Sequence, residues 1–249
     1  MLRSAVVLLV SLLALLALTA LGWVAYRAAT WPDVAALAGR PPETTAFIER
    51  YRQRQRERGL DDAVEWQWVP LSAISPHLAR AVVAGEDMEF FQHQGFSAHE
   101  MRAAAEEALE GGRIRGASTI TQQLAKNLWL SPSRNPLRKL EEALLTGQLE
   151  ERLDKRRILE LYLNVAQFGP GVYGAEAAAQ RYFARPAAEL DPWQAALLAA
   201  SLPRPASWNP DSETEQYLTY ATMIQLRVER ARFLWRLLPG APADTPLTP

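Results

Sequence analysis

The sequence contains no cysteine, and this absence excludes several chemistries at once. Without cysteine the chain forms no disulfide, has no thiolate nucleophile and binds no zinc through sulfur. An excess of one charge is also missing, because 27 basic residues balance 28 acidic ones and leave a formal net charge of −1. The overall charge therefore argues neither for nor against a nucleic-acid partner, and any basic patch must be local. We expect no nucleic-acid partner.

Lysine is nearly absent. The 27 basic residues include only three lysines, at Lys126, Lys139 and Lys155, and the others are arginines. An ammonium group is a compact point charge whereas a guanidinium is a planar fork, so the two are not interchangeable. The three lysine positions are therefore candidates for specific roles, and the alternative is chance within an arginine-rich composition.

One long apolar run lies near the N-terminus. Residues 5–26 carry no charge, and Trp23 and Tyr26 stand where the aromatic belt of a membrane interface would lie. As a helix this run is roughly 33 Å long, enough for a hydrocarbon core of about 30 Å. We predict a transmembrane anchor that follows a short N-terminus, residues 1–4. The alternative, a cleaved signal peptide, has a shorter apolar region of about 7–15 residues.

The rest of the chain divides into three parts. Residues 27–64 are expected to be a juxtamembrane segment, with a solvated helix over 49–58. Residues 65–238 are expected to form one mainly α domain, and the proline-rich tail 239–249 is expected to be disordered. Helices are predicted at 75–86, 98–110, 119–128, 135–153, from 154 onward, 175–183, 192–202 and 213–238, with a turn at the glycines of 169–174 and a strand pattern only at 65–71.

The first cluster of chemically interesting residues is at the end of the predicted helix 75–86. The acidic pair Glu86 and Asp87 runs directly into the aromatic pair Phe90 and Phe91. A carboxylate beside apolar rings is poorly solvated, which raises its pKa and makes it a better general base. The alternative is an acidic helix end that packs against a core cluster.

Two further clusters combine polar and basic residues. Thr119 and Gln122 form a capping-box pattern at a helix start, and such a start attracts phosphate. Lys126 follows Gln122 by one helical turn and shares its face. Arg138 and Glu142 also share a face, four residues apart. The alternatives are an ordinary capped helix and a surface salt bridge. The three histidines, His77, His93 and His99, form no metal-binding pattern.

Taken together and in this order, five segments resemble the motifs of the peptidoglycan glycosyltransferase family, which also forms the N-terminal halves of bifunctional penicillin-binding proteins. These segments are 81–96, 116–130, 138–142, 155–183 and 190–210. The sequence departs from the family pattern at Gly85, Ser97, Ala117, Gln167 and Gln194, and none of these departures removes a predicted catalytic group. The resemblance covers about residues 65–235, and no penicillin-binding domain follows, which points to the monofunctional branch.

The resemblance implies a mainly α fold, a lysozyme-like two-lobed glycosyltransferase domain with an N-terminal transmembrane helix. It implies a hexosyltransferase of cell-wall biogenesis and cell shape that polymerises lipid II into glycan strands, with inversion at the donor anomeric carbon and release of undecaprenyl diphosphate. The implied partners are lipid II, the growing lipid-linked strand and the membrane, with penicillin-binding proteins and the division or elongation machinery as further candidates. The implied location is the bacterial inner membrane, with a single pass, a cytoplasmic N-terminus and a periplasmic domain.

The resemblance also assigns roles to residues. Glu86 is the expected general base, and Glu142 is a second catalytic candidate that holds the neighbouring cations or assists a metal ion. Substrate binding is expected for Asp87, Phe91, His93, Ser118, Thr119, Gln122, Gln123, Lys126, Asn127, Arg138 and Lys139. No cofactor is required, and a divalent cation (Mg²⁺ or Mn²⁺) at the diphosphate is left open. The competing functions are a glycan-cleaving enzyme of similar fold and a non-catalytic, membrane-tethered scaffold of cell-wall assembly.

Overall fold

The computed structural model describes residues 2–98, 102, 118–131, 135–212 and 214–238. The chain forms two compact units, 1–33 and 34–249. The first unit contains the helix α1 (Leu2–Ala29), which is roughly 42 Å long. Its segment Val10–Arg27 is long and apolar enough to cross a membrane. The predicted N-terminal apolar helix is therefore present.

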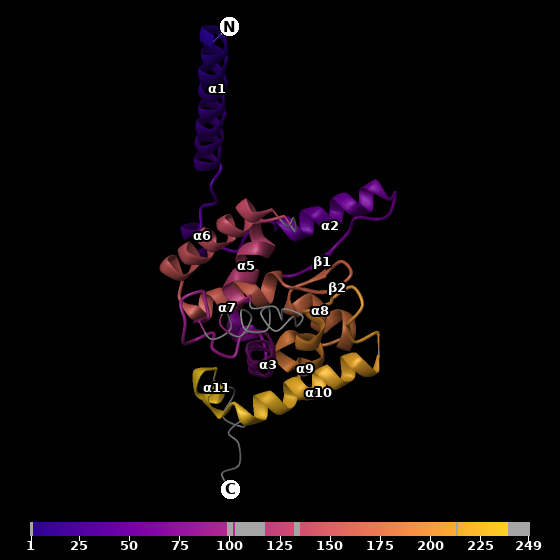
Figure 1. The fold of residues 1–249 in the computed structure, drawn as a ribbon. Helices are drawn as coiled ribbons and strands as arrows, with labels where there is room; N and C mark the ends of the chain where they lie inside the picture. The colour runs from indigo at the N-terminus through magenta and orange to yellow at the C-terminus, as the bar shows by residue number, and fades with distance from the viewer. Residues whose placement is uncertain (1, 99–101, 103–117, 132–134, 213, 239–249) are drawn as a thin grey trace. The chain divides into compact units, whose positions relative to one another are not determined.

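The second unit is mainly α-helical, as predicted (Figure 1). Its α-helices are α2 (Ala46–Glu57), α3 (Pro76–Glu86), α5 (Ile120–Trp129), α6 (Pro136–Arg152), α7 (Lys155–Val165), α8 (Ala175–Phe183), α9 (Pro192–Ser201), α10 (Glu215–Arg230) and α11 (Arg232–Leu237). Three short 3-10 helices lie between them, η1 (Ala35–Ala38), η2 (Leu71–Ala73) and η3 (Ala187–Glu189).

Capping side chains set the starts of the helices that carry the predicted site. Ser75, Thr119, Asn135 and Asp154 each accept a hydrogen bond from a backbone N–H two or three residues further on. Both halves of the predicted capping box between Thr119 and Gln122 are present. Because these contacts are local, the sequence pattern predicts the helix starts correctly.

Two predictions about secondary structure are wrong. The last helix, expected as one element over 213–238, is divided at Ala231 into α10 and α11. The break turns Leu234 and Leu238 into the core, and neither glycine nor proline marks it in the sequence. The second error concerns the glycine turn near residue 170, which joins two strands that were not predicted. The predicted helix 98–110 lies outside the described residues apart from 98 and 102.

The strands form a small sheet in the order β1-β3-β2. The first strand, β1 (Glu65–Trp66), pairs in parallel with β3 (Val172–Tyr173), which pairs antiparallel with β2 (Gln167–Gly169). These strands have two or three residues each, so they are too short to show an alternating pattern in the sequence. Only the first lies inside the predicted strand segment, 65–71.

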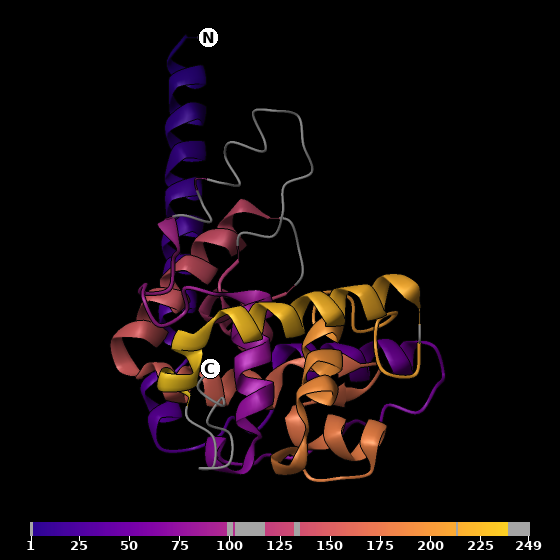
Figure 2. The ribbon, with the colours of Figure 1, turned by 90° about the horizontal axis from the view of Figure 1, so that it is seen from below.

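The helices of the second unit pack in two groups that meet at the predicted site. In one group α10 lies across α3 and α9 (Figure 2). In the other, α5 contacts α2, α6 and α7. Residues 34–64 take part in this packing, because Leu37 and Ile48 are buried. The predicted helix at 49–58 is present as α2, whereas the domain limits stay predictions.

Candidate active site

Glu86 is the last residue of α3, and its half-buried carboxylate is held by α5. Gln123 Nε2 donates a hydrogen bond to Glu86 Oε2 at 2.7 Å. Burial raises the pKa of Glu86 above the ordinary glutamate value, while the Gln123 hydrogen bond and the charge of Lys126 oppose this rise. The structure therefore gives Glu86 the poorly solvated surroundings that a general base needs.

Asp87 and His93 connect the first two motifs of the sequence. Asp87 Oδ2 accepts a hydrogen bond from Ile120 N at 3.0 Å, and both carboxylate oxygens lie within 3.1 Å of His93 Nε2. Gly95 N donates to His93 Nδ1, so Nε2 carries the proton of the neutral ring. Thr119 Oγ1 donates to Gly95 O at 2.7 Å. These residues engage one another and fix the loop after Glu86.

Gly95 allows this loop to approach α6, and replacing it should destabilise the protein. Its φ is +87°, and a Cβ there would lie 2.6 Å from Thr146 Cγ2 and 3.2 Å from Glu150 Cγ. We expect Gly95→Ala to lower the free energy of unfolding by about 2–3 kcal/mol, as measured by denaturant titration. Gly147→Ala on the same helix is the control, because a Cβ there meets nothing within 4 Å. An equal loss in both variants would contradict this explanation.

A cluster of cations lies around Glu142 on α6. Glu142 is buried, and its Oε2 accepts a hydrogen bond from Arg138 Nη1 at 2.6 Å while Oε1 is paired with Lys139 Nζ. Both oxygens of this carboxylate are thus engaged with cations. This contact fits the holding role expected for Glu142.

Lys126 on α5 completes the cation cluster, which we define as Lys126, Arg138 and Lys139. Burial lowers the pKa of Lys126, and the carboxylates of Glu142 and Glu86 oppose this effect while Arg138 and Lys139 add to it. Within the described part of the chain, the Lys126 ammonium has no ion-pair partner. Lys126 is a partly buried cation close to the carboxylates of Glu86 and Glu142. It lies on α5, the helix whose Gln123 binds Glu86.

The third lysine has a structural contact instead. Lys155 Nζ lies 2.7 Å from Glu150 Oε1 and 4.5 Å from the centre of the Phe90 ring. Two of the three lysines therefore belong to the candidate site. Lys155 instead packs against Phe90, in the loop that follows Glu86, and pairs with Glu150 of α6.

The remaining predicted substrate-binding residues are partly used by the fold. The side chains of Thr119 and Gln122 form the capping box, and Asn127 is buried. Ser118 contributes its carbonyl oxygen to Gln123 Nε2 at 3.3 Å, and Phe91 packs edge-on against Phe90 with ring centroids 5.0 Å apart. The structure thus brings Glu86, Gln123 and the cation cluster together. The contacts of Thr119, Gln122 and Phe91 instead hold the start of α5 and the loop after Glu86.

The residues that could bind a metal ion are few. Among the described residues, no three His, Asp or Glu side chains lie close enough together to hold one. Glu142, the carboxylate considered for this role, has both oxygens on Arg138 and Lys139. A divalent cation at the diphosphate stays a prediction.

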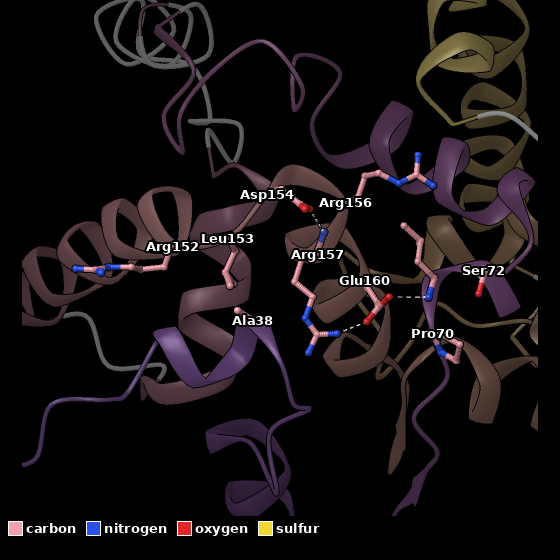
Figure 3. Close-up of a pocket in the computed structure, with 10 residues that line it drawn as sticks. Ala38, Pro70, Ser72, Arg152, Leu153, Asp154, Arg156, Arg157 and Glu160 are labelled. Atoms are coloured by element: carbon pink, nitrogen blue, oxygen red, sulfur yellow. Dashed lines mark hydrogen bonds and ion pairs between the residues drawn. The ribbon is translucent and has the colours of Figure 1, made fainter.

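A pocket of about 510 Å³ lies between η1, η2 and the junction of α6 and α7 (Figure 3). None of the predicted site residues lines it. Arg157 donates to Leu37 O at 2.7 Å and pairs with Glu160, whose Oε2 accepts from Leu71 N at 2.8 Å, whereas Arg152 extends away from them (Figure 3). This network fastens two chain segments to α7 and does not direct several cations toward one point.

One residue next to the site was not among the predicted ones. Tyr162 on α7 donates a hydrogen bond from its hydroxyl to Gln123 Oε1 at 2.8 Å. In the sequence, Tyr162 lies within the segment 155–183 that resembles a family motif, but no role was predicted for it. Its contact joins residues 39 positions apart, so no local pattern could have revealed it.

Two departures from the family pattern have local explanations. Gln194 occupies the third position of α9 and forms a capping box with Asp191, which glutamine can do as well as glutamate. Ser97 Oγ donates to Glu89 Oε2 at 2.8 Å. Neither residue contacts the cation cluster or Glu86 through a hydrogen bond within the described residues.

Comparison with known proteins identifies the family of this chain. Residues 53–229 match the transglycosylase family. A biosynthetic peptidoglycan transglycosylase of Laribacter hongkongensis is 47% identical over 188 residues, which cover 75% of this chain and 82% of the relative. Proteins of the same name from Nitrosospira multiformis (44% over 191 residues, 76% and 83% covered) and Rhodospirillum centenum (48% over 169 residues, 68% and 73% covered) are similar. The chain therefore belongs to the transglycosylase family.

Proposed function

We propose that this chain is a peptidoglycan glycosyltransferase that polymerises lipid II into glycan strands with Glu86 as its general base. One observation carries the proposal. The helix α5 holds the Glu86 carboxylate through Gln123 and, one turn later, presents Lys126 to the cation cluster. A base and an anion-binding group therefore lie side by side, as transfer from a sugar diphosphate requires.

The chemistry follows from these positions. Oε2 of Glu86 is bound by Gln123, so Oε1 takes the proton from the 4-hydroxyl of the acceptor sugar. The hydroxyl oxygen then forms a bond to the donor anomeric carbon, with inversion, as the bond from that carbon to the diphosphate oxygen breaks. The leaving diphosphate gains negative charge, which the cation cluster stabilises. The proton ends on Glu86, and undecaprenyl diphosphate departs.

The competing enzyme function is cleavage of finished glycan. Such an enzyme needs a carboxylic acid and a second carboxylate or a water beside the sugar, and no group that binds a diphosphate. The three cations of the cluster, two of them fixed by Glu142, favour the polymerase. The scaffold alternative is not favoured by any contact in the site.

An assay with two substrates tests the proposal. The purified full chain in detergent is given labelled lipid II, and separately finished glycan strands. We expect new strands from lipid II and no shortening of the finished polymer. Shortening without synthesis would establish the cleaving enzyme, and no reaction with either substrate would favour the scaffold.

The proposed location is the inner membrane, with α1 as a single span and the second unit on the periplasmic side. Support comes from the length and apolar character of α1. A second feature is the leucine stripe of α6, which we define as Leu137, Leu140 and Leu144. Each is more than half exposed, and their spacing places them on one helix face. Since both substrates are lipid-linked in the proposed reaction, this stripe is proposed to enter the bilayer.

The leucine stripe can be tested by fluorescence because the chain has no cysteine of its own. Leu140→Cys, labelled with an environment-sensitive dye in liposomes, should be quenched by lipids that carry a quencher on the acyl chain. Leu226→Cys on α10 is the control, since Leu226 is 45% exposed and lies outside the stripe. Quenching at both positions alike, or none at position 140, would contradict contact between the stripe and the bilayer.

A further inference from the structure

Tyr162 begins a chain of hydrogen bonds that ends on the proposed base. Its side chain is buried, 1% exposed, within α7. Its hydroxyl lies 2.8 Å from Gln123 Oε1, and Gln123 Nε2 lies 2.7 Å from Glu86 Oε2. Three helices, α7, α5 and α3, thus contribute one residue each to a single connected path.

The direction of these hydrogen bonds is fixed by chemistry. The Glu86 carboxylate and the Ser118 carbonyl can only accept, and both lie within 3.3 Å of Gln123 Nε2. The amide nitrogen therefore faces Glu86, and the amide oxygen faces Tyr162. The Tyr162 hydroxyl donates to this oxygen, and burial raises the pKa of Tyr162 well above its ordinary value, so the hydroxyl keeps the proton that it donates. A rotated amide would leave this buried proton without its acceptor.

We infer that Tyr162 is a positioning residue for this reaction: its hydroxyl fixes the Gln123 amide so that the nitrogen, and not the oxygen, faces Glu86. The inference rests on the proposed role of Glu86. Donation from the amide holds one carboxylate oxygen and leaves the other for the acceptor hydroxyl. A rotated amide would instead place its oxygen against the carboxylate, and this arrangement favours protonated Glu86, which cannot act as a base.

Other groups also act on Glu86, but none of them changes charge when the tyrosine hydroxyl is removed. Asp87, the residue that follows α3, raises the pKa of Glu86, and Lys126 on α5 lowers it. On α10, Tyr220 is close enough for the Glu86 charge to raise the pKa of its own hydroxyl. Tyr162 is neutral, so a change in the titration of Glu86 in Tyr162→Phe reports on the orientation of the Gln123 amide.

The pH dependence of kcat/KM on labelled lipid II, measured with the full chain in detergent, tests the inference. In Tyr162→Phe we expect the acidic limb of the profile to move up by about one pH unit, so that the rate at a given pH on this limb falls about tenfold. Tyr217→Phe is the matched control. Tyr217 is also buried, and its hydroxyl donates to Leu197 O at 2.8 Å, so the same group is lost away from Gln123. Its acidic limb should coincide with that of the parent.

A double-variant comparison separates action through Gln123 from a general loss of packing. Gln123→Ala should move the acidic limb upward as well, and adding Tyr162→Phe to it should cause no further shift. An unchanged limb in either single variant, or shifts that add in the double variant, would overturn the inference. If Tyr162→Phe does not fold, an unshifted limb in Gln123→Ala still overturns the inference, because Tyr162 is inferred to act on Glu86 through Gln123.

Failure of the proposed function has a different signature. A parent chain that makes no strands from lipid II, or a Glu86→Gln variant with full activity, would remove the proposed base, and this inference with it. A parent that polymerises, with an inactive Glu86→Gln variant and an unshifted Tyr162→Phe variant, would remove only the role of Tyr162.

Discussion

Replacing Glu86 by glutamine should slow strand formation by two to four orders of magnitude (about 10²–10⁴-fold) while leaving the fold intact. Glutamine has the shape of glutamate and can still accept the hydrogen bond from Gln123 Nε2, but its amide cannot take a proton from the acceptor hydroxyl. General-base catalysis contributes about 10²–10⁴-fold, so we expect a loss of that size in kcat on labelled lipid II. The measurement compares strand formation by the purified parent and Glu86→Gln.

Glu89→Gln provides the control for this prediction. Glu89 lies in the loop that follows α3, and its carboxylate accepts a hydrogen bond from Ser97 Oγ and has no hydrogen bond to Gln123 or to the cation cluster within the described residues. Its replacement removes one charge close to the same helix end, and it should leave kcat within a few-fold of the parent. A similar loss in both variants would mean that negative charge near α3, and not a base at Glu86, supports the reaction.

The raised pKa of Glu86 also fixes the direction of two pH effects. The base must be ionised, so activity should rise with pH through a pKa above the ordinary glutamate value, and Glu86→Gln should lack this limb. Because the pKa is raised in the folded state, the folded state favours the protonated carboxyl, and this contribution to stability is lost as pH rises through the folded pKa. At neutral pH the melting temperature of Glu86→Gln is therefore expected to be at least as high as that of the parent.

Helix starts could be predicted from the sequence because they depend on neighbours. Thr119 and Gln122 lie three residues apart, and the physical rule that links them acts within one turn. The helix patterns placed Glu86 and the three residues of the cation cluster on helices that the structure shows, and the resemblance to a family assigned their roles. Neither the local pattern nor the resemblance predicts the conformation of a side chain. Both ring nitrogens of His93 form hydrogen bonds within the loop, and the one from Gly95 N depends on the positive φ of Gly95.

Contacts between distant segments are where prediction from sequence fails. Gln123 reaches Glu86 and Tyr162 across 37 and 39 positions of sequence, and the packing of three helices decides which of its many neighbours it meets. The division of the last helix at Ala231 has the same origin, because the core accepts Leu234 and Leu238 only after the chain turns. In both cases tertiary packing overrides a local pattern that is compatible with several structures.

The two lysines Lys126 and Lys155 should respond in opposite ways to replacement by methionine. Lys126 is expected to stabilise the leaving diphosphate, so Lys126→Met should lower kcat on lipid II by about 10²–10³-fold. Burial lowers the pKa of Lys126, so the folded state favours its neutral form, and loss of the charge at neutral pH should not destabilise the fold. Lys155 is paired at 2.7 Å with Glu150, whose side chain is 7% exposed, so Lys155→Met should lower the free energy of unfolding by about 2 kcal/mol.

Activity and thermal unfolding, measured on both variants, separate the two roles. Lys126→Arg adds a further test, because it keeps the charge but replaces a compact ammonium by a planar fork. We expect it to recover only part of the activity, since a chain that uses arginine at almost every other basic position retains lysine here. Full activity in Lys126→Met, or unchanged stability in Lys155→Met, would contradict the assignment of Lys126 to the reaction and of Lys155 to the fold. The expected pattern would mean that Lys126 is kept for the reaction at a cost to the fold, and Lys155 for the fold alone.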